Sequence, residues 1–299
     1  MRATEDILPR ICRRIAAHAR PDFHTSVPGL LVSAVTHRDT APDYSLTSPI
    51  LVVMAQGGKR LLLGDRVYEY RAGDCLIVTA DLPVTGHYLD VAPGRPALSM
   101  GLELRPQAIA ELVLQAPRPR QRPDPDVTAI STGAADRELL DAVDRLLGLL
   151  ERPGDIAVLA PLLEQEILWR VLTGPQGPAL RQIGLADSDL NLVGGVIAWI
   201  RDNYAEPISV KQLAGRAGLS PSTLHRRFRQ VTAMSPVQFQ KRIRLQTARA
   251  LLVGHSGDVA SVGHTVGYDS TSQFTREYRR LFGSPPGRHA AQMRAEASF

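Results

Sequence analysis

The chain has 299 residues, of which 44% are hydrophobic and 22% are charged, an ordinary composition for a soluble protein. This length is enough for two domains. No apolar run reaches the roughly 18 residues that span a bilayer, so we expect a cytoplasmic protein without membrane contact. Two cysteines, Cys12 and Cys75, are too few for a disulfide framework or a zinc set.

The charge is unevenly distributed along the chain. Residues 192–299 contain 15 Lys and Arg against 6 Asp and Glu, a net charge of +9, whereas residues 1–191 contain 20 against 24, a net charge of −4. A basic C-terminal third indicates an anionic partner, most simply nucleic acid. Solubilising surface charge would give the same count.

The N-terminal part predicts a helix followed by many short strands. Residues 1–20 repeat Ile7, Ile11 and Ile15 at helical spacing. Apolar runs between turn residues predict strands at Leu30–Val35, Ile50–Ala55, Lys59–Leu63, Arg66–Tyr70, Cys75–Thr79, Thr85–Val91 and Ala97–Leu104. Even spacing of short strands predicts a β-sandwich or a small β-barrel.

Helices are expected after the strands, at Pro106–Gln115 and then twice within residues 136–172. The first of that pair has an apolar seam, formed by Leu139, Val143, Leu146 and Leu150. Such a seam predicts either a homodimer contact or packing on the chain's own strands. Glycines and prolines mark residues 175–190 as a linker, which separates a domain at 1–174 from a second at 191–295.

Two units in the C-terminal third resemble each other at a spacing of 50 residues. In each, a helix ends at a glycine, a small polar residue caps the next helix, and that helix repeats apolar residues every three or four positions. The inward positions are Leu224, Phe228 and Val231 in the first unit and Phe274, Tyr278 and Leu281 in the second. This pattern is typical of helix-turn-helix units, whose second helix has an apolar back and a polar front.

On these residues the C-terminal third resembles the AraC/XylS family of transcription regulators. The matching motifs are Val210-x-x-Leu213-Ala214, Gly218-x-Ser220-x-x-x-Leu224-x-x-x-Phe228, Pro236-x-x-Phe239, Arg244-Leu245-x-x-Ala248-x-x-Leu251-Leu252 and Val266-Gly267-Tyr268-x-Ser270-x-x-x-Phe274-x-Arg276-x-Tyr278-x-Arg280-x-Phe282-Gly283-x-x-Pro286. The sequence departs from the family at Ala233, where a helix-ending Gly is usual, at Gly263, where Ala is usual, and at His289-Ala290. Ala in a left-handed conformation costs about 1 kcal/mol.

The resemblance implies a double helix-turn-helix domain that inserts two recognition helices into successive major grooves of double-stranded DNA, about 34 Å apart. The DNA-contacting positions that it implies are Ser222, His225, Arg226 and Arg229 in the first unit and Thr271, Ser272, Gln273, Thr275, Arg276 and Arg279 in the second. Among these, Arg229 and Arg279 are expected on phosphates and Arg276 on a base. RNA polymerase is a further partner of such regulators.

The N-terminal part resembles, more loosely, the cupin-like effector domain of one AraC-type subgroup. The residues are Gly57-x-Lys59-Arg60-x-x-x-Gly64-Asp65-x-x-Tyr68-x-Tyr70-x-x-Gly73 and Asp81-Leu82-Pro83-Val84. The expected fold is therefore a mainly β cupin-like barrel with flanking helices, followed by an all-α domain. The resemblance implies an unidentified small-molecule effector, for which the inward polar candidates are His24, Tyr70, His87 and Glu103.

The sequence gives less support to an enzymatic function than to a regulatory one. The histidines are scattered, with no His-x-His pair of the kind that binds metal in a cupin barrel, and no nucleotide-binding or nucleophile motif is present. We therefore expect no catalytic residue, no metal and no cofactor. Two alternatives remain: a domain that responds through thiol chemistry at Cys75 or Cys12, and a metal-dependent cupin enzyme tethered to DNA.

Overall fold

The computed structural model describes residues 7–36, 42–92, 94–116, 128–185, 189–254 and 258–296. The chain forms two compact units, one of Met1–Asp43 with Thr47–Leu192 and one of Val193–Phe299 with Tyr44–Leu46. Among the described residues, no helix is both long enough and apolar enough to cross a membrane.

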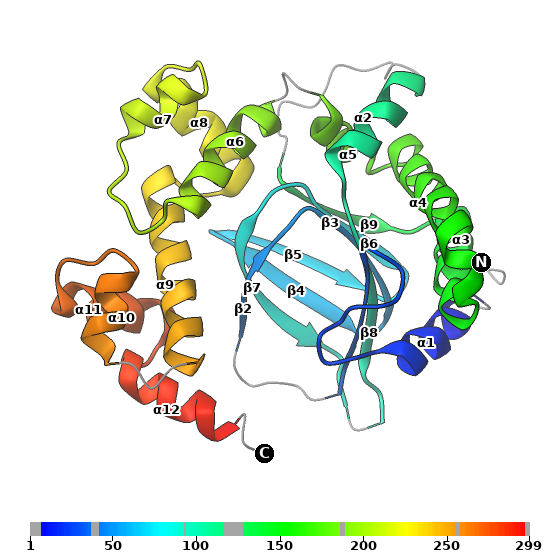
Figure 1. Ribbon diagram of the computed structural model, residues 1–299, viewed down its shortest axis with the longest axis horizontal. Coiled ribbons are helices and arrows are strands. Elements are labelled where there is room, and N and C mark those ends of the chain that lie inside the picture. Colours follow the sequence, from blue (N-terminus) through cyan, green and yellow to red (C-terminus); the bar gives the residue numbers. More distant parts are fainter. Residues whose placement is uncertain are drawn as a thin grey trace. The chain divides into compact units, whose positions relative to one another are not determined.

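The first unit is built on two sheets (Figure 1). The five-stranded sheet has the order β1 (Leu30–Val35), β8 (Ala97–Glu103), β3 (Ile50–Gln56), β6 (Asp74–Val78), β9 (Ile130–Ala134). The four-stranded sheet has the order β2 (Asp43–Thr47), β7 (Leu82–Leu89), β4 (Gly58–Leu63), β5 (Arg66–Arg71). The mainly β fold is confirmed, but in the described part of the chain the strands form two sheets and not one closed barrel.

One face of the five-stranded sheet is covered by helices. Side chains alternate between the two faces of a strand, and the register places Val32, Met100 and Val53 side by side, all buried. Helix α1 (Ile7–His18) packs on β1, β3 and β8, and its three isoleucines are buried. The opposite face of this sheet, which holds half-buried side chains, turns toward β4 and β5 (Figure 1).

The remaining helices of the first unit pack on one another outside the sheet. They are α2 (Pro106–Gln115), α3 (Arg137–Gly148), α4 (Ile156–Thr173) and α5 (Gly177–Gly184), with the short 3-10 turns η1 (Leu149–Glu151) and η2 (Pro153–Asp155) between α3 and α4. Helix α3 contacts α1 and α4, and α2 contacts α4 and α5. The leucine seam expected on the first of the two helices is buried within this unit.

The segment predicted as a linker differs from expectation. Within residues 175–190, the chain forms α5, whose Leu180 and Ile183 are buried and which packs on α2. Pro178 stands in its first turn, where the missing N–H costs nothing. The glycine- and proline-rich stretch therefore starts a helix of the first unit.

The sequence also missed β2 and β9, which lie at the edges of their sheets. Their sequences, DYSLT and ISTGA, lack the apolar alternation of a half-buried strand. An edge strand is specified largely by backbone hydrogen bonds to one neighbour, so its sequence carries a weak signal.

Apart from Tyr44–Leu46 of β2, the second unit is built of helices, as expected. Its elements are α6 (Asp189–Asp202), α7 (Val210–Arg216), α8 (Pro221–Thr232), α9 (Pro236–Gly254), α10 (Val259–Thr265), α11 (Thr271–Phe282) and α12 (Pro286–Glu296). Aromatic side chains form much of the core around α11, where Phe274 and Tyr278 are fully buried with ring centroids 5.6 Å apart. Phe228 of α8 packs edge-on against Phe239 of α9 in the same way.

Helices α8 and α11, which end the two repeated units, have the same kind of C-terminal cap. Ala233 caps α8 at φ 57° and Gly283 caps α11 at φ 80°, and each N–H donates to the carbonyl four residues earlier. The left-handed conformation expected for Ala233 is thus present. It strains alanine, whereas glycine adopts it freely.

We predict that Ala233→Gly raises the stability of the second unit by about 1 kcal/mol, because it removes this strain. Gly283→Ala should lower stability by a similar amount, since no atom lies within 4 Å of the added Cβ and only the backbone is affected. Thermal and urea unfolding of the full chain would measure both. A loss of stability in Ala233→Gly would contradict the strain.

Candidate functional site

The two helix-turn-helix units have the same turn. In the first, Gly218 has φ 64° and Leu219 N–H donates to the Ala214 carbonyl at 2.9 Å; in the second, Gly267 has φ 87° and Tyr268 N–H donates to the Gly263 carbonyl at 3.0 Å. These bonds satisfy carbonyls at the end of the first helix of each unit, while glycine supplies the positive φ. The sequence repeat therefore corresponds to a structural repeat.

The second helix of each unit is capped by a serine. The Ser220 hydroxyl accepts from Thr223 N–H at 3.2 Å, and the Ser270 hydroxyl accepts from Gln273 N–H at 3.3 Å. A serine in this position satisfies a backbone donor that the helix leaves unpaired. The caps fix where α8 and α11 begin, and hence which side chains face outward from their first turns.

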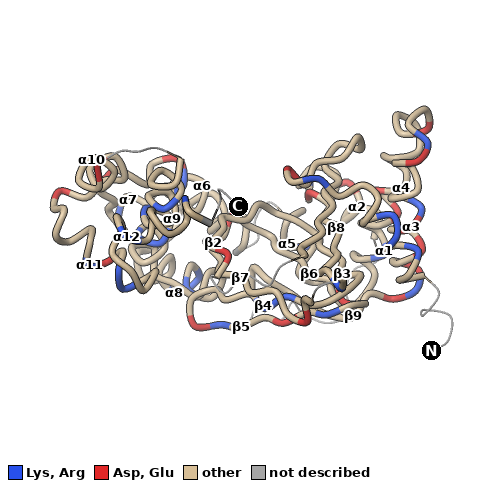
Figure 2. The backbone as a smooth tube through the Cα atoms, turned by 90° about the horizontal axis from the view of Figure 1, so that it is seen from below, with Lys and Arg blue, Asp and Glu red and all other residues tan. Residues whose placement is uncertain are grey.

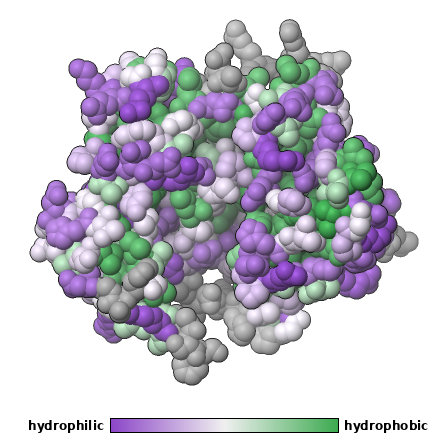
Figure 3. Space-filling model, viewed as in Figure 1, coloured by the Kyte–Doolittle hydropathy of each residue, from purple (hydrophilic) through white to green (hydrophobic). Residues whose placement is uncertain are grey.

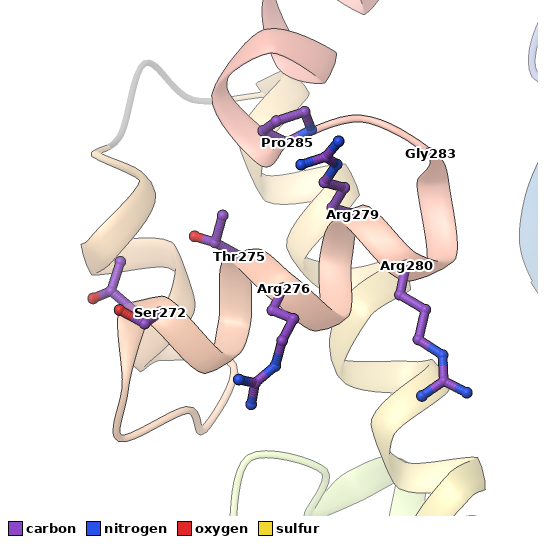
Figure 4. A pocket seen from close by; sticks show the side chains of 8 residues that line it. Ser272, Thr275, Arg276, Arg279, Arg280, Gly283 and Pro285 are labelled. Carbon is purple, nitrogen blue, oxygen red and sulfur yellow. The ribbon is translucent and has the colours of Figure 1, made fainter.

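Both second helices present polar side chains to solvent. The exposed positions are Ser222, His225, Arg226 and Arg229 on α8 and Thr271, Ser272, Gln273, Arg276 and Arg279 on α11, with Thr275 half-buried. On α11, a shallow groove of about 700 Å³ is lined by Thr271, Ser272, Thr275, Arg276, Arg279 and Arg280, and it reaches Gly283 and Pro285. Thr275 and Arg279 extend from one edge of the helix and Arg276 and Arg280 from the other (Figure 4).

Lys and Arg outnumber Asp and Glu in this unit, with 15 against 6 over residues 192–299, and they are spread over its helices (Figure 2). Arg276, Arg279 and Arg280 have no hydrogen bond or ion pair to another side chain among the described residues. Free guanidinium groups on an exposed helix face suit phosphates and base edges.

Gln273 is held by a carboxylate on its own helix. Its amide donates to Glu277 Oε1 at 3.2 Å, and Glu277 also accepts from Lys241 Nζ at 2.8 Å and from the Tyr268 hydroxyl at 2.9 Å. Partial burial acts to raise the pKa of Glu277, but these three donors lower it below the ordinary value. The carboxylate is therefore ionised at neutral pH, and Gln273 would have to leave it to reach a base.

Arg244 of α9 joins three segments of the second unit. Its guanidinium donates to the carbonyls of Tyr204 at 2.6 Å, Ala205 at 3.0 Å and Glu206 at 3.1 Å, and to that of Gly267 at 2.7 Å. The first three lie after α6 and the fourth lies in the turn of the second helix-turn-helix unit. At Gly267 a Cβ would stand 2.1 Å from the Ala205 oxygen, so the approach requires glycine.

The residues predicted to bind an effector are not brought together. Tyr70 is 3% exposed and lies on the inward face of β5, opposite Lys59. His87 pairs with Arg60 on the outer face of the same sheet, where Glu69 also lies. Because strand side chains alternate, Tyr70 and His87 cannot line one site.

The other two candidates lie elsewhere in the first unit. His24 is exposed and makes an isolated bridge to Leu31 ahead of β1. Glu103 ends β8 and lines a cavity of about 360 Å³ toward α4, together with Arg105 and Glu164. Of the four predicted positions, Tyr70 therefore lies on the inward face of a sheet and Glu103 lines a separate cavity.

The described ranges contain no group of three His, Cys, Asp or Glu side chains that could hold a metal ion.

The sequences of two families match the chain. Residues 26–179, which are 154 of the 299, match the family described as AraC-type transcriptional regulator N-terminus, and residues 213–292 match a helix-turn-helix domain. The chain belongs to the AraC-type family of transcriptional regulators.

Two relatives of this AraC-type regulator are called HTH-type transcriptional activator RhaS. That of Escherichia fergusonii is 32% identical over 154 residues, which are 50% of this chain and 54% of the relative. That of Salmonella arizonae is 30% identical over 151 residues, with the same coverage. The chain thus spans about half the length of the curated relatives that it matches.

Solved structures of ToxT from Vibrio cholerae share the fold. An apo form of a ToxT variant has a TM-score of 0.57 at 8% identity, covering 89% of this chain and 98% of that one. Wild-type ToxT described as bound to an unsaturated fatty acid has a TM-score of 0.55 at 7% identity, covering 87% and 94%. At such low identity the similarity concerns the fold alone.

Three residues that the motif analysis did not single out as functional have notable surroundings in the structure: Lys59, Arg244 and Glu277. Lys59 could have been noticed as a charge at an inward position of an alternating strand. Arg244 and Glu277 gave no such signal, because their partners are backbone carbonyls and side chains distant in sequence.

We predict that Arg244→Met destabilises the second unit by about 3 kcal/mol or more, because several charge-assisted hydrogen bonds are lost together. Backbone amide exchange, followed by mass spectrometry, should increase around residues 203–207 and 265–269. Arg244→Lys keeps the charge but offers a single nitrogen, so its stability and its amide exchange should lie between those of the unchanged protein and of Arg244→Met. Unchanged exchange in Arg244→Met would show that the carbonyls do not depend on this side chain.

Cys75 should be unreactive in the native regulator. It is 1% exposed, and burial together with Asp74 raises its pKa to about 11. At about pH 7.5 the thiolate is then about 300-fold rarer than for an ordinary thiol. We predict that iodoacetamide modifies Cys75 at least about 100-fold faster in denaturing urea than in the native protein, measured by peptide mapping. Equal rates would restore thiol sensing at this residue.

Proposed function

We propose that this AraC-type regulator binds double-stranded DNA sequence-specifically, with α8 and α11 in successive major grooves. The observation that carries the proposal is the repeated unit: two helices with the same turn, the same serine cap and an outward polar face, joined by α9. With 19 residues, α9 is about 28 Å long, comparable with the about 34 Å between successive grooves.

The charge distribution supports this proposal. A net charge of +9 over residues 192–299 would displace counterions from DNA and give a salt-dependent affinity. Arg226 and Arg276 are exposed on the outer faces of the two helices, where a guanidinium can bind the O6 and N7 atoms of guanine. Arg229 and Arg279, one helical turn later, would contact phosphates, which position the protein without reading sequence.

The first unit is proposed to sense a small molecule and to change how the second unit binds DNA. Support comes from the membership of residues 26–179 in the regulator N-terminus family and from polar side chains on the inward faces of the sheets. ToxT, which shares the fold, is described as binding an unsaturated fatty acid. In the described ranges no group of three His, Cys, Asp or Glu side chains could hold the metal of the enzymatic alternative, and the raised pKa values of Cys12 and Cys75 weigh against thiol sensing.

Homodimer formation through residues 136–172 stays a prediction, but the side chains that would form the contact are not those of the leucine seam. The seam Leu139, Val143, Leu146 and Leu150 is buried in its own unit and cannot meet a partner. The exposed apolar side chains of this region are on α4, where Val158 is 68% and Leu162 58% exposed, next to Leu159. Figure 3 shows a hydrophobic patch over this helix.

We predict that Arg276→Ala weakens DNA binding by about 10- to 100-fold and does so through particular base pairs, the loss expected for one bidentate contact. Arg279→Ala should weaken binding nearly uniformly across sequences and reduce the slope of log affinity against log salt by about 1. Fluorescence anisotropy on a site selected from a random library, with every single-base variant, would measure both.

Lys211→Ala is the matched control, because Lys211 is an exposed basic residue on α7 outside both outward faces. It should change affinity little. A uniform loss in Arg276→Ala would remove that residue from base reading, and the absence of any selected site would contradict sequence-specific binding.

A further inference from the structure

A lysine occupies the inward face of the four-stranded sheet. Lys59 of β4 lies opposite Tyr70 of β5 on one side and opposite Tyr88 of β7 on the other. The same face continues through Leu61 and Tyr68, which are opposite one another. The outer face carries Arg60 and Glu69, which form an exposed ion pair. Charge on the outer face is ordinary, whereas a charge on the inward face needs a reason.

The side chain of Lys59 is fitted into the sheet. It is 14% exposed and crosses β7 at Gly86, where an added Cβ would stand 2.6 Å from its Cε. The absence of a side chain at Gly86 therefore makes room for the lysine. The ammonium lies 4.4 Å from the centroid of the Tyr88 ring, a favourable cation–π position.

The polar partners of this ammonium are distant. The Asp43 carboxylate and the Tyr88 hydroxyl are each 3.4 Å from Nζ, at the limit of a hydrogen bond. Burial acts to lower the pKa of Lys59, but Tyr88, Tyr70 and Asp43 raise it above its ordinary value, so the group is charged at neutral pH. Burial also raises the pKa of Tyr70 to about 12, which leaves its phenol protonated.

Further polar atoms on the inward faces have no partner. Among the described residues, the Tyr68 hydroxyl and the Ser33 hydroxyl are buried without a hydrogen bond. Ser33 lies on β1, on the face away from the buried Val32, and so turns inward from the other sheet. Buried polar groups are nearly always hydrogen-bonded, and unpaired ones call for an explanation.

We propose that Lys59 is the anchor for an organic carboxylate that binds on the inward face of this sheet. The proposal rests on the sensor role of the first unit and names the chemical class of its effector. One ammonium matches a single negative charge, while the hydroxyls of Tyr88 and Tyr68 are neutral donors for carboxylate oxygens. A phosphate, with nearly two charges, would lack a second cation here.

The rest of the ligand should be apolar. Leu61 is buried beside Lys59, and Leu31 and Val52 are half-buried on the inward face of the five-stranded sheet. Small-molecule sites are lined mostly by apolar side chains with a few placed polar groups. An aromatic or short aliphatic acid has this combination.

Asp43 acts as an internal competitor in this arrangement. Its carboxylate pairs with Lys59 and is itself 48% exposed, so a ligand carboxylate can displace it into water at little cost. The geometry therefore predicts opposite effects for the two members of the pair. Removing the Lys59 charge should weaken binding, and removing the Asp43 charge should strengthen it.

The test uses the full chain and three acids, benzoate, phenylacetate and octanoate, each compared with its primary amide at about pH 7.5, where the acids are ionised. Thermal shift and titration calorimetry are the readouts. At least one acid should raise the melting temperature while its amide does not. Lys59→Met should weaken binding of that acid at least tenfold, and Asp43→Asn should strengthen it.

Arg60→Gln is the matched control, since it removes a cation one position along β4 but from the outer face, and it should leave affinity unchanged. Tyr88→Phe keeps the ring, removes the hydroxyl and should weaken binding several-fold, which provides a second variant if Lys59→Met unfolds. The proposal fails if no acid exceeds its amide, or if folded Lys59→Met binds the acid as tightly as the unchanged protein does. DNA binding of the ligand-free chain, measured separately, reports on the proposed function independently.

Discussion

The contact between Arg244 and four backbone carbonyls is the constraint on which the second unit depends. Its guanidinium joins the end of α6 to the turn of the second helix-turn-helix unit from a position on α9, the helix between the two units. Arginine suits this place because its planar fork donates in several directions at once. The contact thus fixes α9 against the segment that follows α6 and against the turn that precedes α11.

The two units place their candidate functional side chains on opposite kinds of surface. In the second unit, exposed polar side chains stand on helices whose backs are fixed by Phe228, Phe274 and Tyr278, so function lies outward. In the first unit, Lys59 and Tyr70 stand on the inward face of a sheet, where we propose that a small molecule binds. This difference agrees with the proposed division of the chain into a DNA-binding part and a sensing part.

Helix periodicity and turn residues were sufficient for most elements. The strands β1, β3, β4, β5, β6, β7 and β8 and the helices α7, α8, α10 and α11 follow from apolar alternation, serine caps and glycines. The edge strands β2 and β9 and the helix α5 were missed, because backbone pairing and packing on α2 stabilise them where local sequence does not. The effector candidates could not be grouped from the sequence for the same reason. The face of a sheet on which a side chain such as that of His87 lies depends on strand register, which local sequence does not give.

The sequence alone determined the family, the two-domain organisation and the outward residues of α8 and α11, because motifs and helical spacing are local properties of the chain. Tertiary structure decided which side of a sheet each candidate occupies, and so separated His87 from Tyr70 and placed Lys59 between two tyrosines. It also decided that Gln273 donates to Glu277 and that the leucine seam is buried. These outcomes depend on contacts between residues far apart in sequence, which no local pattern encodes.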